Sequence, residues 1–386
     1  MTRIKVLFVL PTLDGGGAER VFVHLLNHLN RERFEVALVL GLRRGTYLAD
    51  LRDDIEVIEL GALQSAKVVT SLARVVRRRR PDIVFSTVYS NFAALLGRAF
   101  FPRGTRVVVR ESSSIKTRLE DVASRSRSRA LLVETFLRRL YPRADRIVCQ
   151  SDFARAEIQS ILRLPAALLT RIYNPVDFPA IETLTQNQPS PYSGPARQIL
   201  AVGRLRSYKG YAFLLPALAQ LHARQCEAGE VPAHLTILGE GEDEAALRQL
   251  ALDLKIADAV DFRSFDRNPF RWMKHADLFV SASIDEAFSN VALEAMACGT
   301  PGVLTDCPGG NREIVEEGVT GWLAPNQNAA GLADVLYDAL AKVPEIDHAA
   351  VTRSCRERFD VAAITAQYEA LFNNVMASRP RKYYGN

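Results

Sequence analysis

Short apolar runs alternate with amphipathic stretches along almost the whole chain. Runs such as Ile4–Leu10 are continuous in Val, Ile and Leu, which is typical of strands buried on both faces of a parallel sheet. In the first half this pattern predicts strands at Ile4–Leu10, Glu35–Leu40, Glu56–Leu60, Asp82–Ser86, Arg106–Arg110, Arg146–Gln150 and Leu169–Tyr173. Helical periodicity predicts helices between them, among others at Glu19–Asn30, Gln64–Arg79 and Asp152–Leu162. This alternation predicts a doubly wound α/β fold.

The alternation breaks at residues 179–197, where turn-forming residues replace apolar periodicity, and then restarts. Beyond the break we expect strands at Ile199–Val202, His234–Leu238, Val260–Arg263, Leu278–Ala282 and Gly302–Thr305, and helices at Tyr211–Arg224, Glu242–Lys255, Asn290–Cys298, Asn328–Lys342 and Ala362–Met376. Pro216 predicts a late start or a kink in the first of these helices. The expected organisation is a first domain at 1–178, a linker at 179–197, a second domain at 198–360 and a final helical segment at 361–386.

Length and composition narrow the class of protein. The chain has 386 residues, 48% of them hydrophobic and 24% charged, as in globular proteins of two or three domains. No apolar run approaches the roughly 20 residues of a membrane-spanning helix, and no secretory signal is visible. The five cysteines lack CxxC spacing, which predicts a reduced, cytoplasmic chain with neither a disulfide framework nor a zinc module.

Charge is distributed unevenly along the chain. Residues 1–180 contain 30 Lys and Arg against 18 Asp and Glu, whereas the remainder contains 19 against 26. A basic first half favours an anionic partner, and the alternative is an arginine-rich surface that only aids solubility. Arg77–Arg80 end a predicted helix, where cations suit the helix dipole and also suit anionic lipid. We do not expect nucleic-acid binding, because no recognised module is present.

Glycine turns and charged residues follow several predicted strands, where ligands bind in open α/β sheets. Gly15-Gly16-Gly17 follow the first strand and open a helix whose N–H groups suit an anion. The turn is neither a dinucleotide fingerprint, since Arg20 replaces its third glycine, nor a P-loop. A tight turn without a ligand is the alternative.

The second half offers a more specific combination. Arg204 and Lys209 share one loop after a strand, where they could converge on a diphosphate. Glu286 follows another strand, Ser289 or Asn290 can cap the next helix, and Glu294 lies about one turn inside it. The helix N-terminus would suit a phosphate while the carboxylates accept hydroxyl hydrogen bonds from sugars. Glycine turns at Gly239–Gly241 and Cys307–Ile314 also follow strands, so a nucleotide site is predicted in this half.

A metal site is not expected. His24 and His28 stand at i, i+4 on the first predicted helix but have no apparent third ligand. The chain also has no Asp-x-Asp pair that would suit a divalent ion bridging phosphates.

The second-half motifs together resemble the signature of the family 4 retaining glycosyltransferases. These motifs are Glu286-x7-Glu294 with Ala295–Pro301, Val202–Arg204 with Lys209-Gly210, and Gly309-Gly310 through Ile314. Gly16–Arg20 resembles the subset that acts on bacterial lipid-linked or surface saccharides. The resemblance spans nearly the whole chain and implies the GT-B architecture, with two Rossmann-like domains facing a cleft and a C-terminal helix returning to the first.

The resemblance also implies roles for individual residues. Arg204 and Lys209 would bind the donor's diphosphate, Glu294 the ribose hydroxyls and Glu286 the hydroxyls of the transferred sugar, with Arg204, Lys209 and Glu286 as the catalytic group. Backbone N–H groups at Phe288, Ser289 and Asn290 and at Gly16 and Gly17 would complete the phosphate site, and Gly239 would line the donor pocket. Two positions depart from the family pattern. Where members often carry a His near the end of the fifth strand, this chain has Arg110-Glu111-Ser112, and Ser264 replaces a common glycine near the base pocket.

The expected function is therefore a metal-independent, retaining hexosyl- or N-acetylhexosaminyltransferase that needs no cofactor. It would use a nucleoside-diphosphate sugar and a lipid-linked or polysaccharide acceptor in bacterial glycan biosynthesis, as a peripheral protein on the cytoplasmic face of the membrane. Two alternatives stay open: another GT-B sugar-nucleotide enzyme, such as an epimerase or phosphorylase, and a non-catalytic protein that binds a nucleotide sugar.

Overall fold

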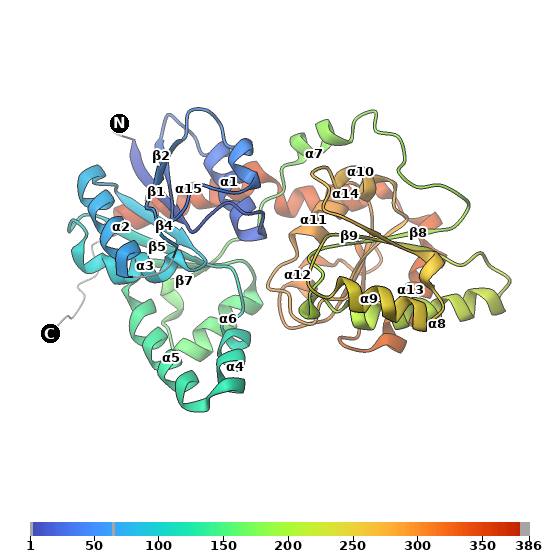
Figure 1. The fold of residues 1–386 in the computed structure, drawn as a ribbon. Coiled ribbons are helices and arrows are strands. Elements are labelled where there is room, and N and C mark those ends of the chain that lie inside the picture. The colour runs from blue at the N-terminus through green and yellow to red at the C-terminus, as the bar shows by residue number, and fades with distance from the viewer. Residues whose placement is uncertain (1–2, 64–65, 379–386) are drawn as a thin grey trace. The chain divides into compact units, whose positions relative to one another are not determined.

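The computed structural model describes residues 3–63 and 66–378, which fold as two compact units (Figure 1). One unit comprises Met1–Pro175 and Val361–Asn386, and the other comprises Val176–Asp360. The two crossings between the units lie side by side, because Val176 forms a parallel bridge with Asp360 and donates its N–H to the Phe359 carbonyl at 2.8 Å. The first crossing thus comes at residue 175, slightly before the expected boundary at 178.

The first unit is built on a parallel sheet of seven strands in the order β3-β2-β1-β4-β5-β6-β7. The strands are β1 (Ile4–Leu10), β2 (Phe34–Leu40), β3 (Glu56–Glu59), β4 (Ile83–Thr87), β5 (Arg106–Glu111), β6 (Arg146–Cys149) and β7 (Leu169–Arg171). All seven strands predicted from the apolar runs are present. The strand order reverses between β1 and β4: β2 and β3 are added on one side of β1, and β4 to β7 on the other.

Alternate residues of these strands enter two different cores, which explains their continuous apolar runs. Phe8, Phe85 and Val108 pack with α1 (Gly17–His28) and α15 (Val361–Ala377), whereas Val9, Val84 and Val109 pack beneath α2 (Ala66–Arg79), α3 (Ser90–Gly97) and α6 (Asp152–Leu162). The last helix, α15, is thus part of the first unit's core. The first two residues of the helix expected at Gln64–Arg79 lie outside the described residues.

The second unit contains a parallel sheet of six strands in the order β10-β9-β8-β11-β12-β13. Its strands are β8 (Gln198–Val202), β9 (His234–Leu238), β10 (Val260–Arg263), β11 (Leu278–Ser281), β12 (Gly302–Thr305) and β13 (Gly321–Ala324). Five were predicted and β13 was not, because its sequence Gly-Trp-Leu-Ala contains no Val, Ile or Thr to mark it as a strand. The two doubly wound sheets confirm the predicted fold class.

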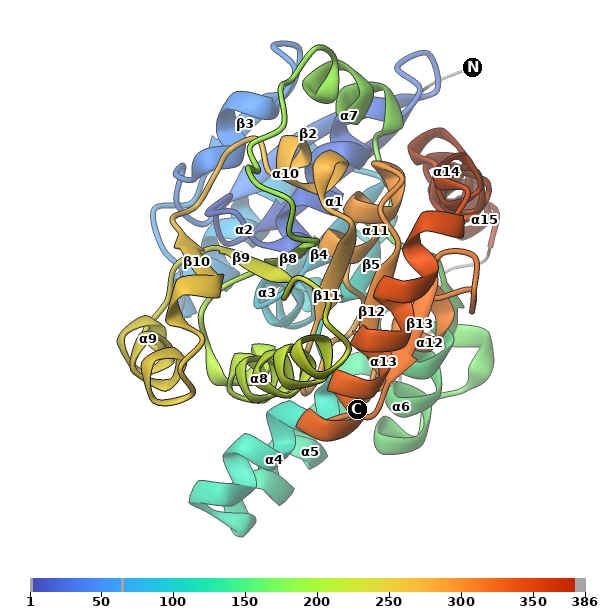
Figure 2. The ribbon, with the colours of Figure 1, turned by 90° about the vertical axis from the view of Figure 1, so that its right-hand side faces the viewer.

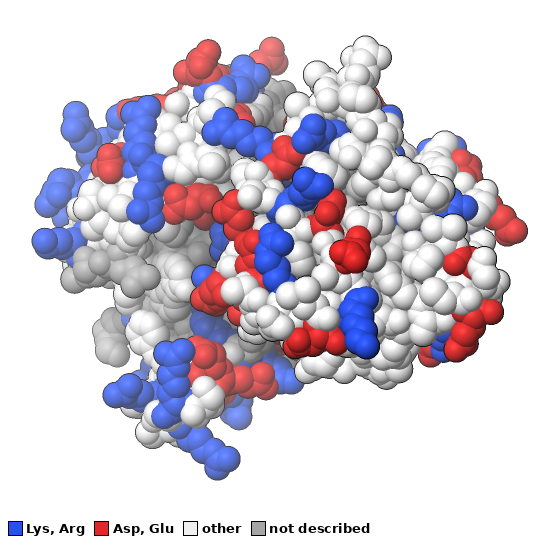
Figure 3. Space-filling view, turned by 45° about the vertical axis from the view of Figure 1, so that its right-hand side comes forward, with Lys and Arg blue, Asp and Glu red and all other residues white. Residues whose placement is uncertain are grey.

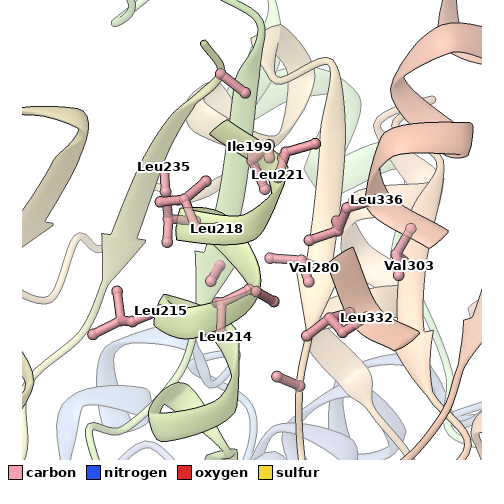
Figure 4. Packing of buried hydrophobic residues seen from close by; sticks show 14 of the residues in the cluster. Ile199, Leu214, Leu215, Leu218, Leu221, Leu235, Val280, Val303, Leu332 and Leu336 are labelled. Atoms are coloured by element: carbon pink, nitrogen blue, oxygen red, sulfur yellow. The ribbon is translucent and has the colours of Figure 1, made fainter. Parts of the chain in front are cut away.

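Helices cover both faces of the second sheet. The apolar faces of α8 (Tyr211–Glu227), α9 (Glu244–Asp253) and α13 (Ala329–Lys342) pack on one face, and Figure 4 shows Leu218 and Leu336 among the side chains that meet there. In Figure 2, α10 (Phe270–His275), α11 (Asn290–Ala297) and α14 (His348–Phe359) lie on the side of the sheet away from α8 and α13. Helix α8 begins at Tyr211 and contains Pro216, so the expected late start is wrong.

The segment expected to be a linker at 179–197 differs from the prediction. Its first residues belong to helix α7 (Phe178–Thr185), whose N-cap Asp177 accepts a hydrogen bond from the Ala180 N–H at 3.1 Å. Phe178 and Ile181 are buried, so the helix packs into the second unit. Irregular backbone is confined to residues 186–197. Two further helices, α4 (Ile115–Arg125) and α5 (Arg127–Leu140), and the short α12 (Asn311–Ile314) complete the α-helices of the described residues, among which none is long and apolar enough to cross a membrane.

Candidate active site

The strand order of the second sheet brings two of the predicted motifs together. Strands β8 and β11 are parallel neighbours at the point where the strand order of this sheet reverses, so the loops after them lie side by side. Lys209, in the first loop, forms an ion pair and hydrogen bond with Glu286, in the second. Each of the two side chains is 17% exposed. Ser283 donates a hydrogen bond from Oγ to the same Glu286 oxygen, Oε2, at 3.3 Å.

The electrostatics of this pair keep the lysine charged. Burial by itself lowers the pKa of Lys209, but the charge of Glu286 and the hydrogen bond to it outweigh burial and raise that pKa. The carboxylate also acts on the nearby Cys307 thiol, whose pKa burial and then Glu286 raise to about 12. Lys209 is therefore a mostly buried cation throughout the physiological pH range.

Glycine lets the two loops approach closely. Gly210 has a φ of +69°, and a Cβ there would lie 1.8 Å from the Ala282 carbonyl oxygen at the end of the neighbouring strand. The Ile284 N–H donates to the Tyr208 carbonyl at 2.8 Å, which joins the two loops a second time. Only a residue without a side chain fits at position 210.

A third loop, after β12, holds the backbone of Glu286 from its other side. The Glu286 N–H donates to the Pro308 carbonyl at 3.3 Å, and the Gly310 N–H donates to the Glu286 carbonyl at 3.2 Å. Gly309 has a φ of +142°, and a Cβ there would lie 1.8 Å from that same carbonyl oxygen. The glycine pair predicted as a turn thus also fixes the position of Glu286.

Helix α11 begins directly after the loop that carries Glu286. Ser289 caps it by accepting a hydrogen bond from the Ala292 N–H at 3.4 Å, and Glu294 lies buried one turn inside the helix. The ring of Phe288 packs on Phe359 at 5.9 Å between centroids, so its side chain is structural and only its backbone can serve a ligand. The N–H groups of the first turn, from Asn290 onward, carry the partial positive charge of the helix N-terminus.

Arg204 and Gly239 lie at the same edge of the sheet. Arg204 is exposed on the loop after β8 and forms no ion pair with any residue that the structure describes. Gly239 (φ +145°) packs against this loop, since a Cβ there would lie 2.0 Å from the Gly203 carbonyl oxygen. Ser264 is exposed directly after β10, next to β9.

In the first unit, the predicted glycine turn lies between β1 and α1. The glycine with positive φ is Gly15, at +105°, while Gly16 is the N-cap of α1 with extended backbone. The Gly16 N–H donates to the carboxylate of Glu19, so a phosphate would have to displace that carboxylate to bind the amide. Gly17 is the first residue of α1.

Arg110, Glu111 and Ser112 follow one another at the end of β5 but have different surroundings. Arg110 is buried on the α15 side and donates from Nη2 to Asn174 Oδ1 at 2.5 Å. Glu111 is buried on the other side, where the hydroxyl of Tyr141 and Nη2 of Arg118 donate to it, the latter at 2.8 Å. Of the three predicted residues, Ser112 is the one that is partly open to solvent.

Sequence reasoning missed the residues that support the Glu286 loop. Thr305 Oγ1 donates to the Ser283 carbonyl at 2.5 Å, and Asn326 Nδ2 donates to the Ile284 carbonyl at 3.1 Å. The feature of the sequence that could have identified them is a polar residue at or just beyond the carboxyl end of a buried strand, as with Thr305 and Ser283. That signal is weak, because such residues also serve as ordinary caps.

Two family models match the chain, one in each half. A model described as glycosyltransferase family 4 matches residues 15–178, and one described as glycosyl transferases group 1 matches residues 196–342. The chain belongs to the family 4 glycosyltransferases. The matched ranges contain all of the predicted site residues.

Two relatives that align with most of the chain are glycosyltransferases named for bacterial lipid-linked or lipopolysaccharide substrates. The chain is 28% identical over 353 residues to N-acetylgalactosamine-N,N'-diacetylbacillosaminyl-diphospho-undecaprenol 4-alpha-N-acetylgalactosaminyltransferase from Campylobacter jejuni, covering 86% of this chain and 90% of that protein. It is 24% identical to the lipopolysaccharide core biosynthesis glycosyltransferase LpsE from Rhizobium meliloti, covering 84% of this chain and 86% of the relative.

Solved structures share the fold of this glycosyltransferase. A glycosyltransferase from Rickettsia africae superposes with a TM-score of 0.79 at 16% identity, covering 98% of this chain and all of its own. Anabaena HepE in complex with UDP-glucose superposes with a TM-score of 0.73 at 22% identity, covering 96% of this chain and all of its own. These similarities, with the two parallel sheets, identify the fold as GT-B.

Proposed function

We propose that this glycosyltransferase moves a sugar from a nucleoside-diphosphate sugar to a lipid-linked saccharide, with retention at the anomeric carbon and without a metal ion. The nucleotide-sugar donor is assigned to the second unit because Lys209 pairs there with Glu286, on the loop that leads into α11. This pair lies where the strand order of the second sheet reverses, between β8 and β11. A buried cation next to a helix N-terminus is suited to an anionic leaving group.

The donor's diphosphate would bind between the β8 loop and α11. Arg204 would contact it bidentately and Lys209 as a point charge, while the N–H groups of the first turn of α11 bind the remaining oxygens. As the bond between sugar and phosphate lengthens, negative charge grows on the leaving diphosphate. Lys209, held by Glu286, and the N-terminus of α11 are preorganised to stabilise that charge, and Arg204 adds a second cation. Such preorganised stabilisation is usually the largest electrostatic contribution to catalysis.

The two carboxylates would orient the donor. Glu286 accepts hydrogen bonds from hydroxyls of the transferred sugar, and Glu294 accepts them from the ribose. Lys209 neutralises Glu286 in the ion pair described above. The bound donor supplies a second anionic partner to the same lysine, so Lys209 links the sugar-binding carboxylate to the leaving group. The backbone hydrogen bonds of Glu286 to Pro308 and Gly310 hold this geometry in place.

A lipid-linked acceptor is supported by the relatives that align over most of the chain. The Campylobacter jejuni relative is named for a diphospho-undecaprenol acceptor, and the Rhizobium meliloti relative for lipopolysaccharide core biosynthesis. A basic first half suits an acceptor that carries a diphosphate and lies at an anionic membrane. We accordingly place the protein on the cytoplasmic face of the membrane, and the transferred group would be a hexose or N-acetylhexosamine.

The test has two stages. Thermal unfolding with a panel of nucleoside diphosphates identifies the base, because a ligand at about 100 times its Kd adds about 2.7 kcal/mol of stability. Transfer from the matching nucleotide sugars to undecaprenyl-diphosphate saccharides is then followed by mass spectrometry, and NMR assigns the anomeric configuration of the product. The proposal predicts acceptor-dependent transfer with retention in EDTA. Donor turnover that is independent of any acceptor would contradict it and favour an epimerase or phosphorylase.

A further inference from the structure

We propose that the helical hairpin α4–α5 docks the first unit onto an anionic phospholipid surface. This inference deepens the proposed function and rests on its lipid-linked acceptor, since a chain that modifies such an acceptor must reach the bilayer. In both Figure 1 and Figure 2, α4 (Ile115–Arg125) and α5 (Arg127–Leu140) lie side by side and extend away from the first sheet.

The outer face of α5 exposes large apolar side chains. Leu131 is 64% exposed and Leu132 is 70% exposed, while Leu137 and Leu140 on the opposite face are buried in the core. Phe136 is 45% exposed and lies between these faces, where its ring stacks on Phe92 of α3 at 6.5 Å between centroids. Isolated exposed apolar residues are ordinary, but here three lie within six residues of one helix. A clustered apolar patch of this kind is typical of a contact surface.

The charges around this patch favour an anionic partner. The hairpin carries seven Lys and Arg against three Asp and Glu. Each acid is paired within its own helix: Glu120 with Lys116 at 3.8 Å, Asp121 with Arg125 at 3.4 Å and Glu134 with Arg138 at 2.5 Å.

Three exposed arginines of α5 therefore remain without an ion pair among the described residues, namely Arg127, Arg129 and Arg139. At the bottom of Figure 3, where this hairpin lies, Lys and Arg side chains project outward, with a few Asp and Glu side chains between them. Exposed leucines flanked by uncompensated arginines match the boundary between acyl chains and anionic headgroups.

The hairpin is attached at both ends to the carboxyl end of β5. Arg118 of α4 and Tyr141, directly after α5, both donate to the buried carboxylate of Glu111. Glu157 of α6 accepts hydrogen bonds from Ser114 Oγ at 3.0 Å and from the Ile115 N–H at 2.9 Å, which secures the start of α4. Since ligands of such sheets bind beyond the carboxyl ends of their strands, the apolar patch is tied to the edge where an acceptor would bind.

The other basic cluster, Arg77–Arg80, is placed differently. It ends α2 just before β4 begins at Ile83, so it lies at the amino edge of the same sheet. Arg79 pairs with Glu56, and Arg77 Nε donates to the Phe100 carbonyl at 2.7 Å. These arginines are therefore a charge-matched control, remote from the edge that binds ligands.

The experiment is co-sedimentation of the full chain with vesicles of phosphatidylglycerol and phosphatidylcholine, compared with phosphatidylcholine alone. One test variant is Leu131→Ser with Leu132→Ser, and the other is Arg127→Gln, Arg129→Gln and Arg139→Gln. Their controls are Leu252→Ser, a 58% exposed leucine on α9, and Arg77→Gln, Arg78→Gln and Arg80→Gln. Thermal unfolding in a nucleoside diphosphate checks that each variant is folded and reports the donor site separately from the membrane.

The unmodified chain should bind the anionic vesicles and not the neutral ones. The arginine variant should lose about 100-fold in partition coefficient, at about fivefold for each cation, and the leucine variant about tenfold or more even at low salt. Both controls should bind within about twofold of the unmodified chain. Equal loss in test and control variants, or no binding by the unmodified chain, would overturn the inference. So would a dimer in vesicle-free sedimentation that Leu131→Ser with Leu132→Ser dissociates, because a second copy would then cover the patch.

Discussion

Gly309→Ala should separate the catalytic role of the Glu286 loop from the stability of the fold. Gly309 has no side chain that could contact a ligand, and its α-carbon faces the carbonyl of Glu286. An added Cβ would lie 1.8 Å from that oxygen, at a φ of +142° that L residues rarely adopt. To regain ordinary contact the two loops must separate by roughly 1.5 Å, which removes Glu286 from its position beside Lys209.

The size of the effect follows from this geometry. Backbone strain of this kind costs about 1–3 kcal/mol, which corresponds to a fall in Tm of several degrees. A displacement of about 1 Å in a positioned catalytic group costs on the order of 10² in rate, so kcat should fall about 100-fold or more. The control is Gly318→Ala, because Gly318 also has a positive φ, +75°, but nothing lies within 4 Å of an added Cβ.

The assay is release of the nucleoside diphosphate from the preferred donor at saturating acceptor, together with Tm for each variant. Both alanine variants should lose stability, and only Gly309→Ala should lose turnover. If Gly309→Ala retains full turnover, or if Gly318→Ala loses as much, then the contact between the β12 loop and Glu286 does not position the catalytic group.

Four further predictions follow from the structure. Arg204→Ala and Lys209→Ala should each lower turnover by about 10²–10³ while far-UV circular dichroism is unchanged, and near-normal turnover in both would count against their contact with the leaving group. Because the pKa of Lys209 is raised above its unfolded value of about 10.4, the stability from its ion pair is complete below that pH and is lost as pH rises through the higher folded value. Urea unfolding should thus show a constant difference between the unmodified chain and Lys209→Met from pH 6 to about 9, and a difference that already shrinks near pH 8 would contradict the pairing. Dialysis against EDTA should leave transfer unchanged, and restoration of a lost rate by Mg²⁺ would disprove the metal-free mechanism. Phe372→Ala should cost about 3–5 kcal/mol in the free energy of unfolding, because its ring packs on Phe85 at 5.4 Å, and a loss below about 1 kcal/mol would mean that α15 is dispensable to the first unit.

The parts of the fold that depend on local pattern were predictable from sequence. Continuous apolar runs identified twelve strands, because both faces of each sheet are buried and leave little alternation. The pattern failed where an element lacks the residues that usually mark it. Strand β13 contains no Val, Ile or Thr, and α5 divides its apolar residues between a buried face and an exposed one, so no single apolar stripe is visible. Most of helix α7 was mistaken for linker because its eight residues show little apolar periodicity and include Pro179, a common turn residue that also suits the first turn of a helix.

The candidate site was predictable as a set of loops but not as a set of contacts. Lys209 and Glu286 meet only because β8 and β11 are neighbours, and strand order depends on crossover connections that no local pattern encodes. The burial of Arg110 and Glu111 could not be foreseen either, since charged residues at a strand end are usually exposed. Their partners, Asn174 and Tyr141, are far from them in sequence.

A crystal structure with the tightest-binding nucleoside diphosphate, grown in EDTA, would test the donor site most directly. The phosphates should lie at the carboxyl edge of the second sheet, with Lys209 Nζ and the Arg204 guanidinium within hydrogen-bond distance of their oxygens and the N-terminal turn of α11 facing them. Phosphates bound away from both cations would contradict it, and so would a nucleotide that binds only when a divalent ion is restored.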